Sequence, residues 1–169
     1  MSGVGALQAP GSRLWHRRPV LFWGLILGLA MGVLHAVVPI FGDDITFANY
    51  SATSGLFEFI QHRYLTWSSR VFIEAILWLI APLPVVWRVL DVLLLVALYY
   101  CAVKIFLKKQ DFVACASVAA VVVIYPFWHM STAGYIATTT NYLWPVALAF
   151  VAGYGLKKAL DGVRMRWWE

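Results

Sequence analysis

The fold of this chain is decided by residues 20–44, which read VLFWGLILGLAMGVLHAVVPIFGDD. The run before Gly42 contains no Asp, Glu, Lys or Arg over 22 residues, longer than the apolar core of roughly 7–15 residues in a secretory signal. Arg17 and Arg18 precede the run, and no small-x-small cleavage site follows it. We therefore expect a retained membrane span that ends at two adjacent carboxylates, Asp43 and Asp44.

The composition of the whole chain is typical of a membrane protein. Of its 169 residues, 62% are hydrophobic and 12% are charged, whereas a soluble domain carries roughly 25% charged residues. The net charge of +5 is explained by basic loops at a membrane surface, so we predict no nucleic-acid partner. Cys101 and Cys115 both lie in apolar runs and indicate neither a disulfide framework nor a metal cluster.

Five apolar segments are candidate membrane spans, at 20–41, 71–86, 89–107, 112–127 and 143–156. If all five crossed, nine of the thirteen Lys and Arg residues would lie outside. If 71–83 lies on the outer surface instead, ten of the thirteen become cytoplasmic, and the spans are about 20–41, 84–107, 111–129 and 142–157. Because basic loops stay inside, we predict an all-α, polytopic, four-span protein of the cell membrane with both termini cytoplasmic. A hairpin of two spans over 71–107 is the alternative.

These spans divide the chain into a basic cytoplasmic N-terminus at 1–19, a single membrane domain at 20–157 and a cytoplasmic tail at 158–169. The outer loop, 42–83, is expected to hold two interfacial helices, one over 51–61 and one beginning at Val71. Arg70 and Glu74 have the i,i+4 spacing of a surface ion pair. Pro82 and Pro84 end any helix before the next span.

The first span carries Gly24, Gly28 and Gly32 at a spacing of four residues. Small residues at this spacing let two helices approach closely, and we expect the partner to be another span of this chain. His35 lies within the same span, and we interpret it as a packed, hydrogen-bonded residue.

Polar side chains concentrate on the predicted outer side. A carboxylate at the membrane surface can deprotonate a hydroxyl or bind a divalent ion, so Asp43 and Asp44 are the candidate catalytic residues. Since adjacent side chains rarely point the same way, we expect one to face the site and the other, with Asp44 favoured, to be a helix N-cap. Arginine side chains suit a phosphate group. Hydroxyl, amide and aromatic side chains suit a sugar. The candidate substrate-binding residues are therefore Arg63, Tyr64, Trp67, Arg70, Arg88, Tyr135, Asn141 and Tyr142.

No cofactor is predicted. His62 and His129 lack metal-ligand spacing, and the chain has no Gly-rich phosphate loop, nucleophile elbow or zinc motif. A divalent ion is compatible with the acidic pair, but no ligand spacing supports a metal site.

Three motifs occur in order: Gly42-Asp43-Asp44, Arg63-Tyr64-Leu65-Thr66-Trp67-Ser68-Ser69-Arg70 and Asn141-Tyr142-Leu143-Trp144-Pro145. Through them, about residues 20–157 resemble the GT-C superfamily of membrane glycosyltransferases, and more narrowly a group of poorly characterised bacterial multi-span proteins similar to the glucosyltransferases that modify surface polysaccharide. The resemblance implies inverting transfer of a sugar from a polyprenyl-phosphate donor to a cell-surface acceptor on the outer membrane face. It implies that a first-loop aspartate, Asp43 or Asp44, is the catalytic carboxylate.

The partners expected from this resemblance are membrane lipid and a lipid-linked sugar. GT-C enzymes are longer than this chain and have more spans, so we expect it to be an N-terminal part that further helices, from the same protein or a partner chain, complete. The alternative is a non-catalytic small membrane protein, either an assembly or transport subunit or an inactive remnant. Transport is disfavoured because only His35 is an ionisable candidate near the middle of a span.

Overall fold

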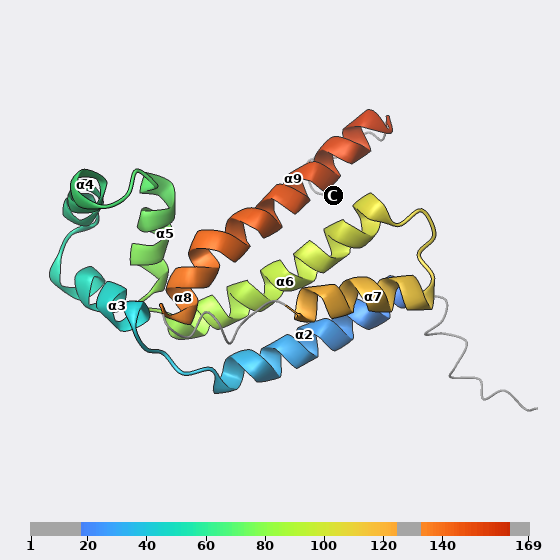
Figure 1. The fold of residues 1–169 in the computed structure, drawn as a ribbon, viewed down its shortest axis with the longest axis horizontal. Helices are drawn as coiled ribbons and strands as arrows, with labels where there is room; N and C mark the ends of the chain where they lie inside the picture. Colours follow the sequence, from blue (N-terminus) through green and yellow to red (C-terminus); the bar gives the residue numbers. More distant parts are fainter. Residues whose placement is uncertain (1–17, 125–132, 163–169) are drawn as a thin grey trace, which may run out of the picture.

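The computed structural model describes residues 18–124 and 133–162, and every regular element in this part of the chain is a helix (Figure 1). This confirms the all-α prediction. The elements, in chain order, are α2 (Pro19–Val37), α3 (Asp43–Thr53), α4 (Leu56–Thr66), α5 (Val71–Ile80), α6 (Pro84–Phe106), α7 (Phe112–Val123), α8 (Tyr135–Thr138), the π-helix η2 (Thr139–Leu143) and α9 (Trp144–Leu160).

Two of these helices, α2 with 19 residues and α6 with 23, are long and apolar enough to cross a membrane. The first is shorter than the predicted span 20–41, because Val38 precedes Pro39 and takes an extended conformation with ψ 123°. The helices α5 and α7 are apolar but shorter. The described residues therefore contain two candidate spans, and the count of four stays a prediction.

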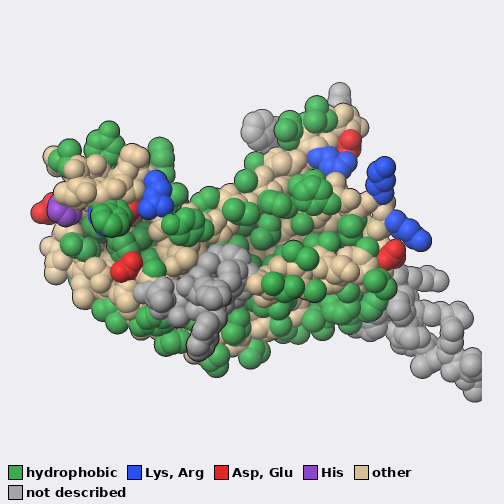
Figure 2. All heavy atoms as spheres, viewed as in Figure 1, with side chains coloured by type: hydrophobic (Ala, Val, Ile, Leu, Met, Phe, Trp, Pro, Cys, Tyr) green, Lys and Arg blue, Asp and Glu red, His purple; other side chains and the backbone are tan. Residues whose placement is uncertain are grey.

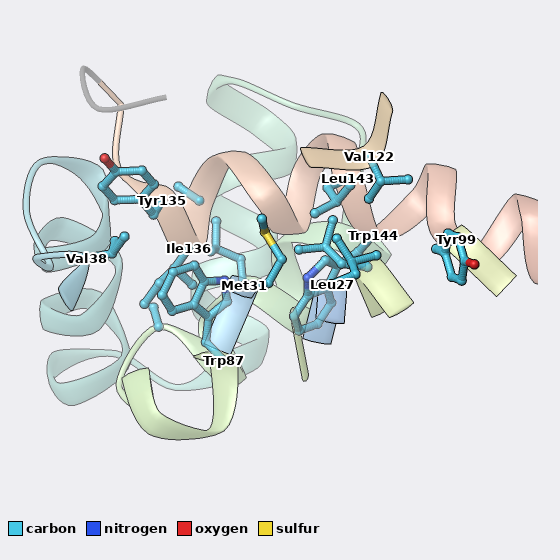
Figure 3. Packing of buried hydrophobic residues seen from close by; sticks show 14 of the residues in the cluster. Leu27, Met31, Val38, Trp87, Tyr99, Val122, Tyr135, Ile136, Leu143 and Trp144 are labelled. Carbon is cyan, nitrogen blue, oxygen red and sulfur yellow. The ribbon is translucent and has the colours of Figure 1, made fainter. Parts of the chain in front are cut away.

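The central helix is α6, which packs against α2, α7 and α9. Figure 1 shows α2, α6 and α7 running side by side, while α9 diverges from them toward its C-terminal end. Apolar side chains fill the space between these helices and α8, including Leu27, Trp87 and Ile136 (Figure 3), each at most 2% exposed. This bundle supports the helices α3, α4, α5 and α8 at one of its ends.

At one end of the bundle, α3, α4, α5 and α8 gather into a separate layer (Figure 1). The single helix predicted over 51–61 is wrong: α3 ends at Thr53 and α4 begins at Leu56. The chain breaks there because Ser54 and Gly55 both have extended backbones.

The break predicted between Val71 and the next span is present. α5 ends at Ile80, and a turn containing Pro82 separates it from α6. With 10 residues, α5 has a length of about 15 Å, roughly half the thickness of a hydrocarbon core. It is shorter than α2 and α6, the two described helices that are long and apolar enough to cross a membrane.

Candidate functional site

The two adjacent aspartates have different environments, and Asp44 is the buried one at 0% exposed. Its Oδ2 accepts a hydrogen bond from the Tyr135 N–H and its Oδ1 one from the Ala137 N–H, both at 2.8 Å. These N–H groups belong to the first turn of α8, where a helix has no backbone acceptors of its own. Asp44 is therefore a cap, as expected for one of the pair, but it caps α8 and not its own helix, whose N-cap is Gly42.

The protonation of Asp44 is set by two opposing effects. Burial raises the pKa of its carboxyl, the backbone N–H groups of residues 135–137 lower it, and the charge of Asp43 adds a smaller rise. Burial dominates, so the pKa lies above its ordinary value. A carboxylate enclosed in this way has no open side on which a substrate can bind.

Asp43 is exposed, and its side chain makes no hydrogen bond or ion pair with any residue that the structure describes. Its backbone N–H donates to the Ala133 carbonyl oxygen at 3.2 Å. The main chain of Asp43 is therefore held in place by this bond and by the two hydrogen bonds that the neighbouring Asp44 side chain accepts from α8, which we call the Asp44 clamp. Asp43 is the member of the pair that is open to solvent.

Arg63, the first residue of the second motif, is paired with a carboxylate. Arg63 donates from Nε to Oε2 of Glu74 at 3.1 Å and from Nη2 to Oε1 at 3.2 Å, and Glu74 is 2% exposed. The same guanidinium lies 5.2 Å from the ring centroid of Phe47 and 5.8 Å from that of Trp67. This pair joins α4 to α5, which gives Arg63 a structural task; its role in binding phosphate stays a prediction.

The predicted surface pair of Arg70 with Glu74 is wrong. Arg70 is the N-cap of α5 and has a non-helical backbone, so the i,i+4 geometry of a helix does not apply to it. Its Nε donates instead to the Ser68 hydroxyl at 3.0 Å, and the side chain is exposed. Tyr64 and Trp67 are also exposed, at 58% and 75%.

The third motif begins in the π-helix η2, an element that often marks functional positions. Asn141 donates from Nδ2 to the Ala137 carbonyl oxygen at 2.6 Å, while its Oδ1 is buried with no partner among the described residues. Tyr142 is 60% exposed. Tyr135, at the start of α8, is buried with its ring edge-on to that of Phe41 at 5.6 Å.

Within the part of the chain that the structure describes, the candidate residues are not gathered around one of the larger hollows. Arg88 lies apart from the others, in a hollow between α2 and α6, and its Nη2 donates to the Val38 carbonyl oxygen at 2.9 Å. A hollow of about 530 Å³ between α3 and α4 is lined by other residues, among them Glu58, Gln61 and His62. The structure thus groups Asp43, Asp44 and Tyr135 closely and leaves the arginines distributed. His129 lies outside the described residues.

A buried polar cluster in the bundle was missed by the sequence reasoning. His35 Nε2 lies 2.8 Å from Oδ2 of Asp91, and the Trp144 indole donates to Oδ1 at 2.6 Å. His35 Nδ1 lies 2.8 Å from the Met31 carbonyl oxygen, so His35 is the packed, hydrogen-bonded residue that we expected. Two ionisable residues inside apolar runs, each of which needs a polar partner there, are the signal that predicts such a pair.

No group of three or more His, Cys, Asp or Glu side chains within 18–124 and 133–162 is arranged to hold a metal ion. Comparisons with family models, with curated proteins and with solved structures found no match for this chain. Its function is therefore inferred from the residues and their geometry.

Proposed function

We propose that this chain provides the outer face of a GT-C-like membrane glycosyltransferase, which transfers a sugar from a polyprenyl-phosphate donor to a cell-surface acceptor. The observation that carries the proposal is the difference between the two aspartates, of which Asp44 is buried and hydrogen-bonded and Asp43 is exposed. Asp44 is engaged in holding α8, whereas Asp43 is exposed on a fixed main chain and has no partner in the described residues. An unpaired, well-positioned carboxylate is what a general base requires.

In this proposal the Asp43 carboxylate takes the proton of an acceptor hydroxyl. The acceptor oxygen then attacks the anomeric carbon of the sugar, and the bond between that carbon and the phosphate oxygen breaks. Polyprenyl phosphate leaves with the electron pair, and the configuration at the anomeric carbon is inverted. Asp44 is a positioning residue here, because it acts through the backbone that it anchors.

The gathering of the motifs at one end of the molecule supports this reading. The first motif opens α3, the second spans the end of α4 and the start of α5, and the third lies in η2 and the first turn of α9 (Figure 1). All these elements lie at the same end of α6. Sequence segments 91 residues apart are thus joined where an outer-face substrate would approach.

We place this end outside the membrane, with four spans at about 20–41, 84–107, 111–129 and 142–157. The C-terminal ends of α6 and α9 lie at the opposite end of the bundle, and Figure 2 shows Lys and Arg side chains over them. Lys104, Lys108, Lys157 and Lys158 belong to these ends. Basic residues on one side favour that side as cytoplasmic.

The test uses membranes that contain the full chain and undecaprenyl-phosphate-linked radiolabelled glucose as donor. Asp43→Asn should lower sugar transfer to extracted surface glycans by at least about 100-fold, because removing a general base costs roughly 10² to 10⁴ in rate. Asp161→Asn, which removes an exposed carboxylate at the opposite end, is the matched control and should keep the activity. Equal transfer by wild type and Asp43→Asn, at equal protein levels, contradicts the proposal.

A non-catalytic assembly subunit is the second candidate, and one observation favours it. An apolar hollow of about 430 Å³ lies between α6, α7 and α9, lined by side chains such as Leu98, Val121 and Phe150. A hollow of this size and lining suits apolar side chains of a further helix packed against α6, α7 and α9. A wild-type chain that transfers no sugar from any donor but is recovered with a second membrane protein seated on Phe150 supports this candidate instead.

A further inference from the structure

The seam between α2 and α6 contains a cation that the described chain leaves without a counter-ion. Among residues 18–124 and 133–162, Arg88 makes one hydrogen bond, from Nη2 to the Val38 carbonyl oxygen, and its buried Nε has no partner. No carboxylate of the described residues lies within ion-pair distance of it. A guanidinium has five N–H donors, so most of its capacity to bind an anion is unused.

A groove runs from this arginine along the two helices. The hollow at Arg88, about 380 Å³, is lined by Gly32 and Ala36 of α2 and by apolar residues of α6. A second hollow of about 410 Å³, lined by Gly24, Gly28 and Tyr100 among others, adjoins it, since Val92 and Leu93 line both. The small residues of α2 keep the groove open: a Cβ atom at Gly32 would meet nothing within 4 Å.

The dimensions and chemistry of the groove match a phosphate-headed lipid. From Arg88 to Tyr100 it extends about 18 Å along α6, slightly more than half of a hydrocarbon core of about 30 Å. Arg88 is the fifth residue of α6, about 6 Å along the axis from the helix start, and this is a depth at which a headgroup phosphate can be reached. Toward the other end the lining is almost wholly apolar and suits an acyl chain.

We propose that this groove binds one anionic glycerophospholipid, with its phosphate on the Arg88 guanidinium and an acyl chain along the glycine stripe. The groove opens toward the surrounding bilayer, since Leu25, Leu29 and Val89 on its rims are 55%, 59% and 55% exposed. Phospholipid is the abundant phosphate-headed molecule there. An uncompensated positive charge favours an anionic headgroup over a zwitterionic one, whose ammonium group the arginine repels.

This lipid site is separate from the sugar-transfer site proposed above. None of the residues that line either hollow comes from α3, α4 or α5. The binding can be measured on the full chain without any donor or acceptor sugar, so its failure and the failure of the proposed function are distinguishable.

The experiment is native mass spectrometry of the detergent-purified full chain with added phosphatidylglycerol, phosphatidylethanolamine or undecaprenyl phosphate. Wild type should bind one phosphatidylglycerol in preference to phosphatidylethanolamine. Arg88→Gln should weaken phosphatidylglycerol binding by about tenfold or more, because charge-assisted hydrogen bonds are lost. Arg88→Lys should be intermediate, since it keeps the charge but not the planar fork.

Two further variants separate this site from general charge and from misfolding. Lys109→Gln removes one exposed positive charge beyond the other end of α6 and should bind as wild type does. Gly32→Leu fills the groove where its Cβ has open space, and should reduce binding with Arg88 intact. Unchanged phosphatidylglycerol binding in Arg88→Gln or in Gly32→Leu overturns the proposal. Equal binding of phosphatidylethanolamine overturns the headgroup assignment, and displacement by equimolar undecaprenyl phosphate overturns the choice of phospholipid.

Discussion

Gly134 lies directly against the carboxylate of Asp44, so closely that a Cβ atom on Gly134 would be 2.5 Å from Oδ1. Gly134 also has φ +97°, in the region that residues with a side chain rarely adopt. The bare Cα lets the chain turn into α8 so that the N–H groups of Tyr135 and Ala137 point at Asp44. The link between the two polar loops therefore depends on this contact.

Replacing Gly134 by alanine should destabilise the protein by about 2 kcal/mol or more, because the new methyl group meets the carboxylate and the backbone is strained. Thermal unfolding in detergent, followed by tryptophan fluorescence, measures the loss. Gly155→Ala is the matched control: it lies within α9, has open space around its Cα, and should be neutral or stabilising by about 0.5–1 kcal/mol. Equal melting temperatures for the two variants contradict this geometry.

Asp44→Asn should destabilise the fold by about 1–3 kcal/mol, whereas Asp43→Asn should leave it within about 0.5 kcal/mol of wild type. An asparagine amide at position 44 would place an N–H donor against one of the two backbone N–H groups that need an acceptor. Asp43 loses only a solvent-exposed charge. Urea unfolding of both variants in the same detergent gives the comparison, and a destabilisation shared by the two would show that Asp44 is not the clamp.

The advantage of wild type over Asp44→Asn should shrink as the pH rises. Burial raises the pKa of Asp44 above its ordinary value of 3.8, so the folded state holds this proton more tightly than the unfolded state. The stability from protonated Asp44 is thus fully present below about pH 3.8 and is lost as the pH rises through the higher folded pKa. Unfolding free energies of both proteins from about pH 3.5 to 7 test this, and a difference that grows with pH would reverse the sign.

Arg63→Gln should destabilise the protein by about 3 kcal/mol, because it leaves the Glu74 carboxylate buried and unpaired. Arg70→Gln is the control for loss of a nearby arginine and should cost no more than about 0.5 kcal/mol. In the double variant Arg63→Gln with Glu74→Gln, much of the loss should be recovered, since no buried charge is left alone. If Arg70→Gln destabilised the protein more than Arg63→Gln does, Glu74 would be paired with Arg70, as the i,i+4 spacing in the sequence predicted.

The bundle was predictable from the sequence because it follows from runs of apolar residues and their breaks. The start of α6 at Pro84 and the separate α5 follow from prolines, which act locally. Likewise, the burial of one aspartate and exposure of the other follow from their adjacency in one helix turn. The boundary at Val37 was missed, although Pro39 carries the same kind of local signal.

The partners of the polar side chains were not predictable, because they are set by packing between distant segments. Glu74 has Arg70 at i−4, yet pairs with Arg63 from the preceding helix. The contact of Asp44 with residues 135 and 137 spans 91 and 93 positions, and no spacing rule reaches that far. The pair of His35 and Asp91 was within reach of the sequence, since each needs a partner inside an apolar run.

The proposed function depends most on the layer of α3, α4 and α5 lying outside the cell, opposite the loop between α6 and α7. Cysteines placed singly at Thr53 and Lys109, both exposed, test this with a membrane-impermeant maleimide on spheroplasts. The native Cys101 and Cys115 are buried, so background labelling should be low. We predict that the cysteine at 53 reacts before lysis and the one at 109 only after it. Labelling of 109 with protection of 53 would contradict the placement of Asp43 on the outer face.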